Sequence, residues 1–116
     1  MSTYRIAIVG PKEAVAGFAL LGVDVAAATT AEEAAAHLLR LKRSMRTEEG
    51  RERNVYGVVF VAEDLMGGLS ADDQKKLSRG ALPAIIPLPS HRGSTGYGLH
   101  RLKRIVERAI GSDILK

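Results

Sequence analysis

The chain has 116 residues, of which 46% are hydrophobic and 26% are charged, with a formal net charge of +4 and no cysteine. This length suits one domain with one hydrophobic core. The lack of cysteine excludes disulfides, iron–sulfur clusters, thiolate zinc sites and cysteine nucleophiles, and a mild positive charge alone does not indicate nucleic-acid binding.

The composition also predicts which partners and cofactors are absent. No apolar run approaches the roughly 20 residues that span a bilayer, and the opening MSTYRIAIVG lacks the pattern of a secretory signal. We therefore expect a cytoplasmic protein that inserts no segment into a membrane and is peripheral to one only through its partners. His37, His91 and His100 share no ligand-like spacing with acids, so we expect no metal and no cofactor. The few aromatic residues form no stacking surface for nucleic acid.

Four short apolar segments, each bounded by Gly, Pro, Asn or Asp, predict β-strands at residues 4–10, 23–29, 55–62 and 82–89. The first, third and fourth are almost continuously apolar. That pattern is typical of strands in a parallel sheet that helices cover on both faces.

Helices are predicted between and after these strands, at residues 11–21, 31–47, 71–79 and 99–110. In the second of them Thr30 and Glu33 form a capping box, and Ser70 with Asp73 gives a similar start to the third. One apolar face of the second helix recurs at Ala34, Leu38, Leu41 and Met45.

The alternating order predicts an α/β fold: a four-stranded parallel sheet with helices on both faces, a flavodoxin- or Rossmann-like three-layer sandwich. By analogy with flavodoxin-like folds we expect the strand order 2-1-3-4. The charged stretch 42–54 is expected to be the exposed end of the second helix followed by a mobile loop.

We divide the chain into a globular α/β domain (1–92), a glycine-rich hinge (93–98) and a C-terminal amphipathic helix with its tail (99–116). The hinge contains Gly93, Gly96 and Gly98, which permit unusual backbone dihedrals at little cost. A mobile C-terminal helix would follow from them.

The loop GSTGYG (93–98) has a second interpretation, as a phosphate- or nucleotide-binding loop at a helix N-terminus. Its GxxGxG spacing matches neither the dinucleotide fingerprint nor the Walker A motif, so we favour the hinge. A third interpretation is a small hydrolase or transferase in which His91 acts with Ser90, Ser94 or Thr95, and only their adjacency in the sequence supports it.

Glu63 and Asp64 follow the third strand, where a response-regulator receiver carries its phosphorylated aspartate. A receiver also needs an acidic pair after the first strand and a lysine after a late strand. Here the first strand ends in Gly10-Pro11 and the fourth in Pro89-Ser90. We reject that function and expect carboxylates in a loop or at a helix N-terminus.

The predicted C-terminal helix is strongly amphipathic. At about 100° per residue, one apolar stripe contains Leu99, Leu102, Ile105, Val106, Ala109 and Ile110. The opposite side carries Arg101, Arg104, Glu107 and Arg108. Such a stripe can pack on the chain's own sheet or on a partner, and we predict that this stripe, with the three arginines, binds a partner.

Two parts of the chain resemble a known family, the F subunits of V-type/archaeal-type rotary ATPases. The first is IIPLPS (85–90) through HRGSTGYGLHRLKRIVERAIGSDIL (91–115). The ending Ala109, Ile110, Gly111, Asp113, Ile114 and Leu115 matches the family pattern. The second is the region 6–23, with Ala16-Gly17-Phe18 and Leu21-Gly22 in place.

The resemblance implies a non-catalytic subunit of the central stalk. Such subunits bind the D subunit, which forms the coiled-coil shaft, and rotate with it. They couple the A3B3 catalytic head to a membrane-rotor adaptor subunit, and thereby ATP synthesis or hydrolysis to ion transport. The family's C-terminal helix, residues 99–110 here, reaches toward the head and can modulate ATP hydrolysis.

Overall fold

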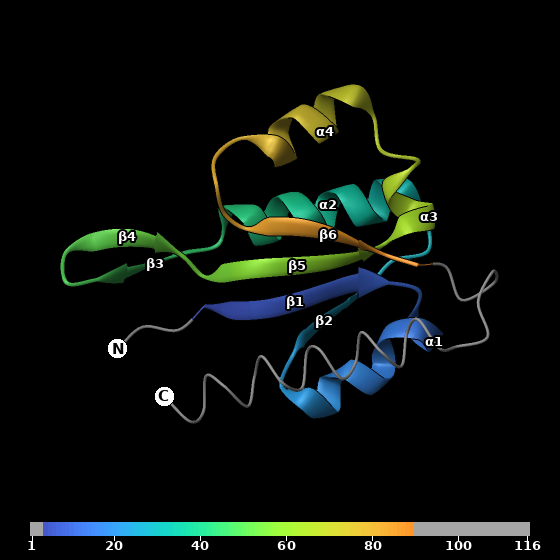
Figure 1. Cartoon of the computed structure of the whole chain (residues 1–116), viewed down its shortest axis with the longest axis horizontal. Helices are drawn as coiled ribbons and strands as arrows, with labels where there is room; N and C mark the ends of the chain where they lie inside the picture. Colours follow the sequence, from blue (N-terminus) through green and yellow to red (C-terminus); the bar gives the residue numbers. More distant parts are fainter. Residues whose placement is uncertain (1–3, 90–116) are drawn as a thin grey trace.

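The computed structural model describes residues 4–89. A central four-stranded parallel sheet lies between two helical layers (Figure 1). In chain order the elements are β1 (Arg5–Gly10), α1 (Lys12–Val15), the 3-10 helix η1 (Ala16–Leu21), β2 (Asp24–Ala27), α2 (Ala31–Arg43), β3 (Met45–Glu48), β4 (Arg51–Asn54), β5 (Tyr56–Ala62), α3 (Glu63–Met66), α4 (Ala71–Ser78) and β6 (Ala84–Leu88).

The sheet order is β2-β1-β5-β6, with every neighbouring pair parallel. These four strands correspond to the four predicted ones, so the expected order 2-1-3-4 is confirmed. The α/β class is confirmed with it. The parallel pairing needs a crossover between successive sheet strands, and the helices return the chain to the start of the next strand.

Side chains of the strands alternate between two cores. Ala7, Val9, Val59 and Val61 belong to the larger core under α2, α3 and α4. The smaller core contains Ile8 and Phe60 under α1 and η1. The buried residues explain why these strands lack the polar alternation of a half-solvated sheet.

The predicted helix caps form. Thr30 Oγ1 accepts a hydrogen bond from Glu33 N–H at 3.1 Å, and Ser70 Oγ accepts one from Asp73 N–H at 3.1 Å. Glu33 Oε1 in turn accepts from the Thr29 hydroxyl at 2.9 Å. The hydrogen bonds that the Glu33 carboxylate accepts from Thr29 and Thr30 hold the pKa of Glu33 below its usual range, and the bond from the Thr29 side chain is the main cause.

The prediction for residues 42–54 was wrong. Helix α2 ends at Arg43, because Ser44 has extended dihedrals (φ −69°, ψ 116°). The next residues form the antiparallel hairpin β3–β4, which projects from one end of the body (Figure 1). Its turn residues Glu49 (φ 52°) and Gly50 (φ 78°) are both left-handed, as a two-residue type I′ turn requires. Met45, expected on the helix face, lies instead in β3.

Two smaller expectations also need correction. The first helix is α-helical only to Val15 and continues as η1, ending at the left-handed Gly22 (φ 79°). Strand β6 is an edge strand whose Ile86 and Pro87 are exposed, so it is not buried on both faces as predicted. Pro87 fits an edge, where a missing N–H breaks no ladder.

Candidate partner-binding surfaces

The edge of the sheet where the strands end is the usual site of chemistry in α/β folds. Here Gly10 closes β1, and a Cβ built on it would lie 3.1 Å from Val15 Cγ1 and 3.4 Å from Ala62 Cβ. Helix and strand therefore pack closely at this position. Glu63 and Asp64 are exposed in the first turn of α3, as their expected place at a helix N-terminus requires.

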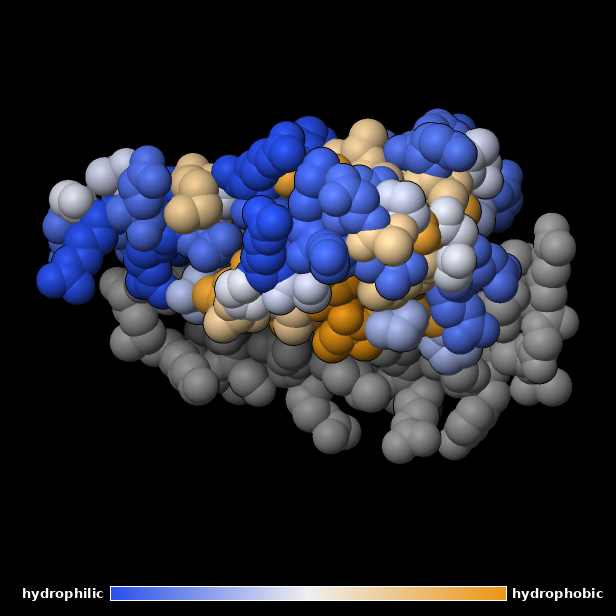
Figure 2. Space-filling model, turned by 90° about the horizontal axis from the view of Figure 1, so that it is seen from above, coloured by the Kyte–Doolittle hydropathy of each residue, from blue (hydrophilic) through white to orange (hydrophobic). Residues whose placement is uncertain are grey.

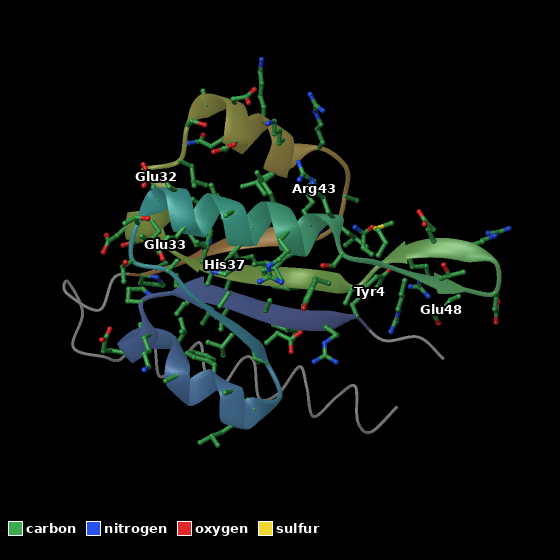
Figure 3. The ribbon with its side chains drawn as sticks, turned by 180° about the vertical axis from the view of Figure 1, so that it is seen from behind. Tyr4, Glu32, Glu33, His37, Arg43 and Glu48 are labelled. Atoms are coloured by element: carbon green, nitrogen blue, oxygen red, sulfur yellow. The ribbon has the colours of Figure 1, made fainter. Side chains whose placement is uncertain are left out.

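The described residues 4–89 contain no group of three or more His, Asp or Glu side chains that could hold a metal ion. His37 lies half-exposed on α2, with its Nδ1 3.1 Å from Arg40 Nη2 (Figure 3). His91, Ser90, Ser94 and Thr95, the residues weighed for catalysis, lie outside the described residues.

The opposite edge of the sheet carries a polar cluster that joins three strands. Arg5 donates two hydrogen bonds to Asp24, from Nε at 2.8 Å and Nη2 at 2.6 Å. The Tyr56 hydroxyl donates to the same carboxylate at 2.7 Å. The hydrogen bonds from Arg5 lower the pKa of Asp24, while burial and the bond to Asp24 raise the pKa of Tyr56. The cluster stabilises the sheet, because every member lies on a different strand.

An apolar row crosses the sheet on the side of α1 and η1. The parallel register places Val25 beside Ile8, Ile8 beside Phe60 and Phe60 beside Ile86. The central pair is buried, whereas Val25 and Ile86 at the two ends are 37% and 40% exposed. Leu20 on η1 is 90% exposed. Large apolar side chains left open to water in this way are candidates for a protein contact.

A hollow of about 400 Å³ lies between α4 and β6, and its apolar lining includes Met66, Leu77, Pro83 and Ile85. The Lys42 ammonium bridges the loop beside it by donating to the carbonyls of Arg79 and Leu82. Polar Gln74 and Ser78 also line the hollow.

The predicted partner-binding residues and hinge glycines, at positions 93–110, lie outside the described residues. The division at residue 92 stays a prediction for the same reason. Sequence reasoning missed the exposed Leu20, Val25 and Ile86. A signal for Leu20 was present in the run AGFALLGV, which carries no charge over about two helical turns.

The fold defines the class: the described residues form a doubly wound α/β domain with several large apolar side chains exposed on its surface. The family model of the ATP synthase (F/14-kDa) subunit matches residues 6–106. The chain belongs to this family, which makes it an accessory subunit of an ATP synthase complex with other subunits as its partners. The family assignment drawn from the sequence is thus confirmed.

Curated relatives and a solved structure agree with the family. The F subunit of the V-type ATP synthase of Fusobacterium nucleatum is 35% identical over 112 residues, covering 97% of this chain and 96% of the relative. The F subunit of the A-type ATP synthase of Thermococcus kodakarensis is 34% identical over 110 residues, covering 95% and 97%. The crystal structure of the F subunit of the V-type ATP synthase from Archaeoglobus fulgidus aligns with a TM-score of 0.58 at 20% identity, covering 74% of this chain and 98% of that one. That likeness supports the fold.

Within residues 4–89, no helix is both long and apolar enough to cross a membrane.

Proposed function

We propose that the chain is a non-catalytic central-stalk subunit of a V/A-type rotary ATPase. It binds the D subunit, the coiled-coil shaft, and turns with it between the catalytic head and the membrane-rotor adaptor, on the cytoplasmic side of the membrane. In this role it couples ATP synthesis or hydrolysis to ion transport without itself reacting with nucleotide.

The family match over residues 6–106 carries this proposal, because it spans both the α/β body and most of the amphipathic segment 99–110. The apolar stripe of that segment supplies a contact surface for a coiled coil. The rim arginines Arg101, Arg104 and Arg108 favour orientation and specificity more than affinity. In the body, the exposed Leu20 and Val25 add apolar area on one side of the sheet.

Titration of the chain with the recombinant shaft subunit tests the proposal. We expect a 1:1 complex for the full chain, weakened at least tenfold by Leu102→Ser on the apolar stripe. The matched control is Lys103→Ser, one residue away at the margin of the stripe, which should change the affinity less than threefold.

Three outcomes separate the alternatives. Equal binding by the Leu102→Ser and Lys103→Ser variants would mean that the main contact lies in the α/β body. No binding by the unmodified chain overturns the proposal. Saturable nucleotide binding that Gly96→Pro abolishes would establish instead the phosphate-binding interpretation of GSTGYG.

A further inference from the structure

The described helices cover the two faces of the sheet unequally. On one face, α2 and α3 pack against β1, β5 and β6, and α4 packs on α2. Seen from the side of α4, the described surface is largely hydrophilic, as a complete outer layer is (Figure 2). On the other face, α1 and η1 pack against β1 and β2 (Figure 1). Among the described helices, the two on that side therefore cover β5 and β6 incompletely.

The incompletely covered area is apolar and continues across three strands. The register places Ile6 beside Val58 and Val58 beside Ala84, one row before the row of Phe60 and Ile86. Phe60 is buried, whereas Ile6 and Val58 are half-buried and Ala84 and Ile86 are exposed. These five residues are hereafter the open face. Parallel sheets normally have helices over both faces, so the open face lacks a cover among the described residues.

The chain contains a segment of suitable length and position to supply this cover. Strand β6 ends at Leu88 beside the open face, and residues 90–116 follow. A helix over residues 99–110 would be about 18 Å long, close to the roughly 16 Å of the five-residue strand β6. The connecting residues 90–98 can span up to about 30 Å, so such a helix can return along β6.

The chemistry of this segment matches the open face. One side of a helix over residues 99–110 would carry an apolar stripe of Leu99, Leu102, Ile105, Val106, Ala109 and Ile110. Packed on the sheet, this stripe would remove apolar area from water on both surfaces. The arginines of the opposite side would stay in water, where their charges need no partner.

We propose that residues 99–110 dock as a helix on the open face when the chain is free, with the apolar stripe against Val58, Ala84 and Ile86. The docking does not depend on the proposed function, but its consequence rests on it. The stripe that binds the shaft is also the stripe that docks, so the two contacts exclude each other. Docking is therefore an autoinhibitory contact, which lowers the apparent affinity for the shaft in proportion to the undocked fraction of the chain.

Hydrogen exchange in the free chain tests the docking. A helix of twelve residues alone in water is marginal, so slow exchange of its amides requires a contact that holds it. Amides of residues 103–110 should exchange at least tenfold more slowly in the unmodified chain than in Ile86→Glu, which places a charge on the open face. The protection should be equal at two chain concentrations tenfold apart, since a second copy as occupant would make it depend on concentration.

The matched control is Leu20→Glu. Leu20 is 90% exposed on η1, outside the open face, so the same new charge there should change the exchange of residues 103–110 less than twofold. Ala84→Glu is a second disruption of the open face at an exposed position, and keeps the test valid if Ile86→Glu disturbs the sheet. Circular dichroism and the unfolding midpoint of each variant verify that the fold is intact.

Titration with the shaft subunit tests the competition. Ile86→Glu should bind the shaft at least threefold more tightly than the unmodified chain, because the body no longer holds the stripe. Equal exchange of residues 103–110 in the unmodified chain and in both open-face variants, or protection that depends on concentration, overturns the docking. Unchanged or weaker shaft binding by a variant that has lost the protection overturns the competition. If neither the unmodified chain nor Ile86→Glu binds the shaft, the proposed function falls, and the exchange alone decides the docking.

Discussion

The α/β body and the β3–β4 hairpin are stabilised by different interactions. The body holds two apolar cores, and Ile8, Val9 and Val59 are completely buried in it. In the hairpin, Met45 is the one large apolar side chain, and it is 44% exposed. The hairpin is maintained by its type I′ turn, its four-residue ladder and the Glu48 ion pairs.

The body and the hairpin are therefore expected to contribute differently to the free energy of folding. Burial of apolar area contributes most of the free energy of folding, so substitutions in the body report on stability. Surface charge pairs contribute little, so substitutions in the hairpin should lower the free energy of unfolding less than substitutions in the cores. The following predictions test the comparison, starting from its largest expected effect.

Leu38→Ala should lower the free energy of unfolding by about 2–5 kcal/mol, because it leaves a cavity in a fully packed core. Leu38 has no exposed area and lies on α2 above the sheet. Urea denaturation measures the change. Thr47→Ala in the hairpin is the control, expected within about 0.5 kcal/mol of the unmodified chain. Equal losses of unfolding free energy in both variants would contradict the view that the body, and not the hairpin, determines the stability.

Asp24→Asn should lower the stability at pH 7 by about 1–3 kcal/mol, because the hydrogen bonds from Arg5 and Tyr56 then reach a neutral group. The folded pKa of Asp24 is lowered, so its contribution is complete above the unfolded value near 3.9 and is lost as the pH falls through the folded value. Unfolding measured between neutral and strongly acidic pH should show a smaller acid-dependent loss in the variant. Identical acid profiles would assign the acid dependence to other carboxylates.

Thr30→Ala should cost about 1 kcal/mol by removing the acceptor for Glu33 N–H at the start of α2. Thr30→Ser keeps the hydroxyl and should recover most of that loss. Thermal unfolding of the two variants side by side provides the measurement. No difference between Ala and Ser would show that the cap is not a stabilising feature.

Gly50→Ala should have the smallest global effect, below about 0.5 kcal/mol, although it strains the left-handed turn residue (φ 78°) by about 1 kcal/mol locally. The strain acts on a hairpin that opens without disturbing the cores, so amides of residues 45–54 should exchange faster while the unfolding midpoint stays constant. Gly17→Ala is the matched control, since a Cβ there meets no atom within 4 Å. A global loss as large as that of Leu38→Ala would show that the hairpin and body unfold as one unit.

The four sheet strands and both caps could be predicted from the sequence, because their signals are local and chemically specific. Ile6 to Val9 and Val58 to Val61 combine β-branched and apolar residues with turn residues on either side. Thr30 and Ser70 each accept a hydrogen bond from the residue three positions on, as proposed from spacing alone. The strand order was expected by analogy with flavodoxin-like folds, and the structure has that order.

The hairpin could not be predicted from its composition, because RTEEGRER contains residues of low β propensity. Its signal was the Glu49-Gly50 pair, a weaker form of the Asn-Gly and Asp-Gly turns that favour type I′ geometry. Met45 continued the apolar spacing of α2, which extended the predicted helix past Ser44. The exposure of Ile86 in β6 depends on sheet order and covering elements, which a single strand does not encode.

The predicted partner-binding residues of segment 99–110 stay predictions, as do the hinge glycines. The family assignment could be made from both ends of the chain, whereas the exposure of Leu20 and the β3–β4 pairing became evident only in the three-dimensional structure. A residue's exposure is a property of the whole fold, and periodicity in one element does not determine it.

The parallel pairing of β1 with β5 has a consequence for biosynthesis. Ile8 pairs with Phe60, a partner about 50 residues later in the chain, which takes the ribosome roughly 3–10 s to synthesise. During that time the apolar faces of β1 lack their central neighbour, with only β2 available to pair. Until β5 has been synthesised, the apolar side chains of β1 therefore stay open to contacts with other proteins.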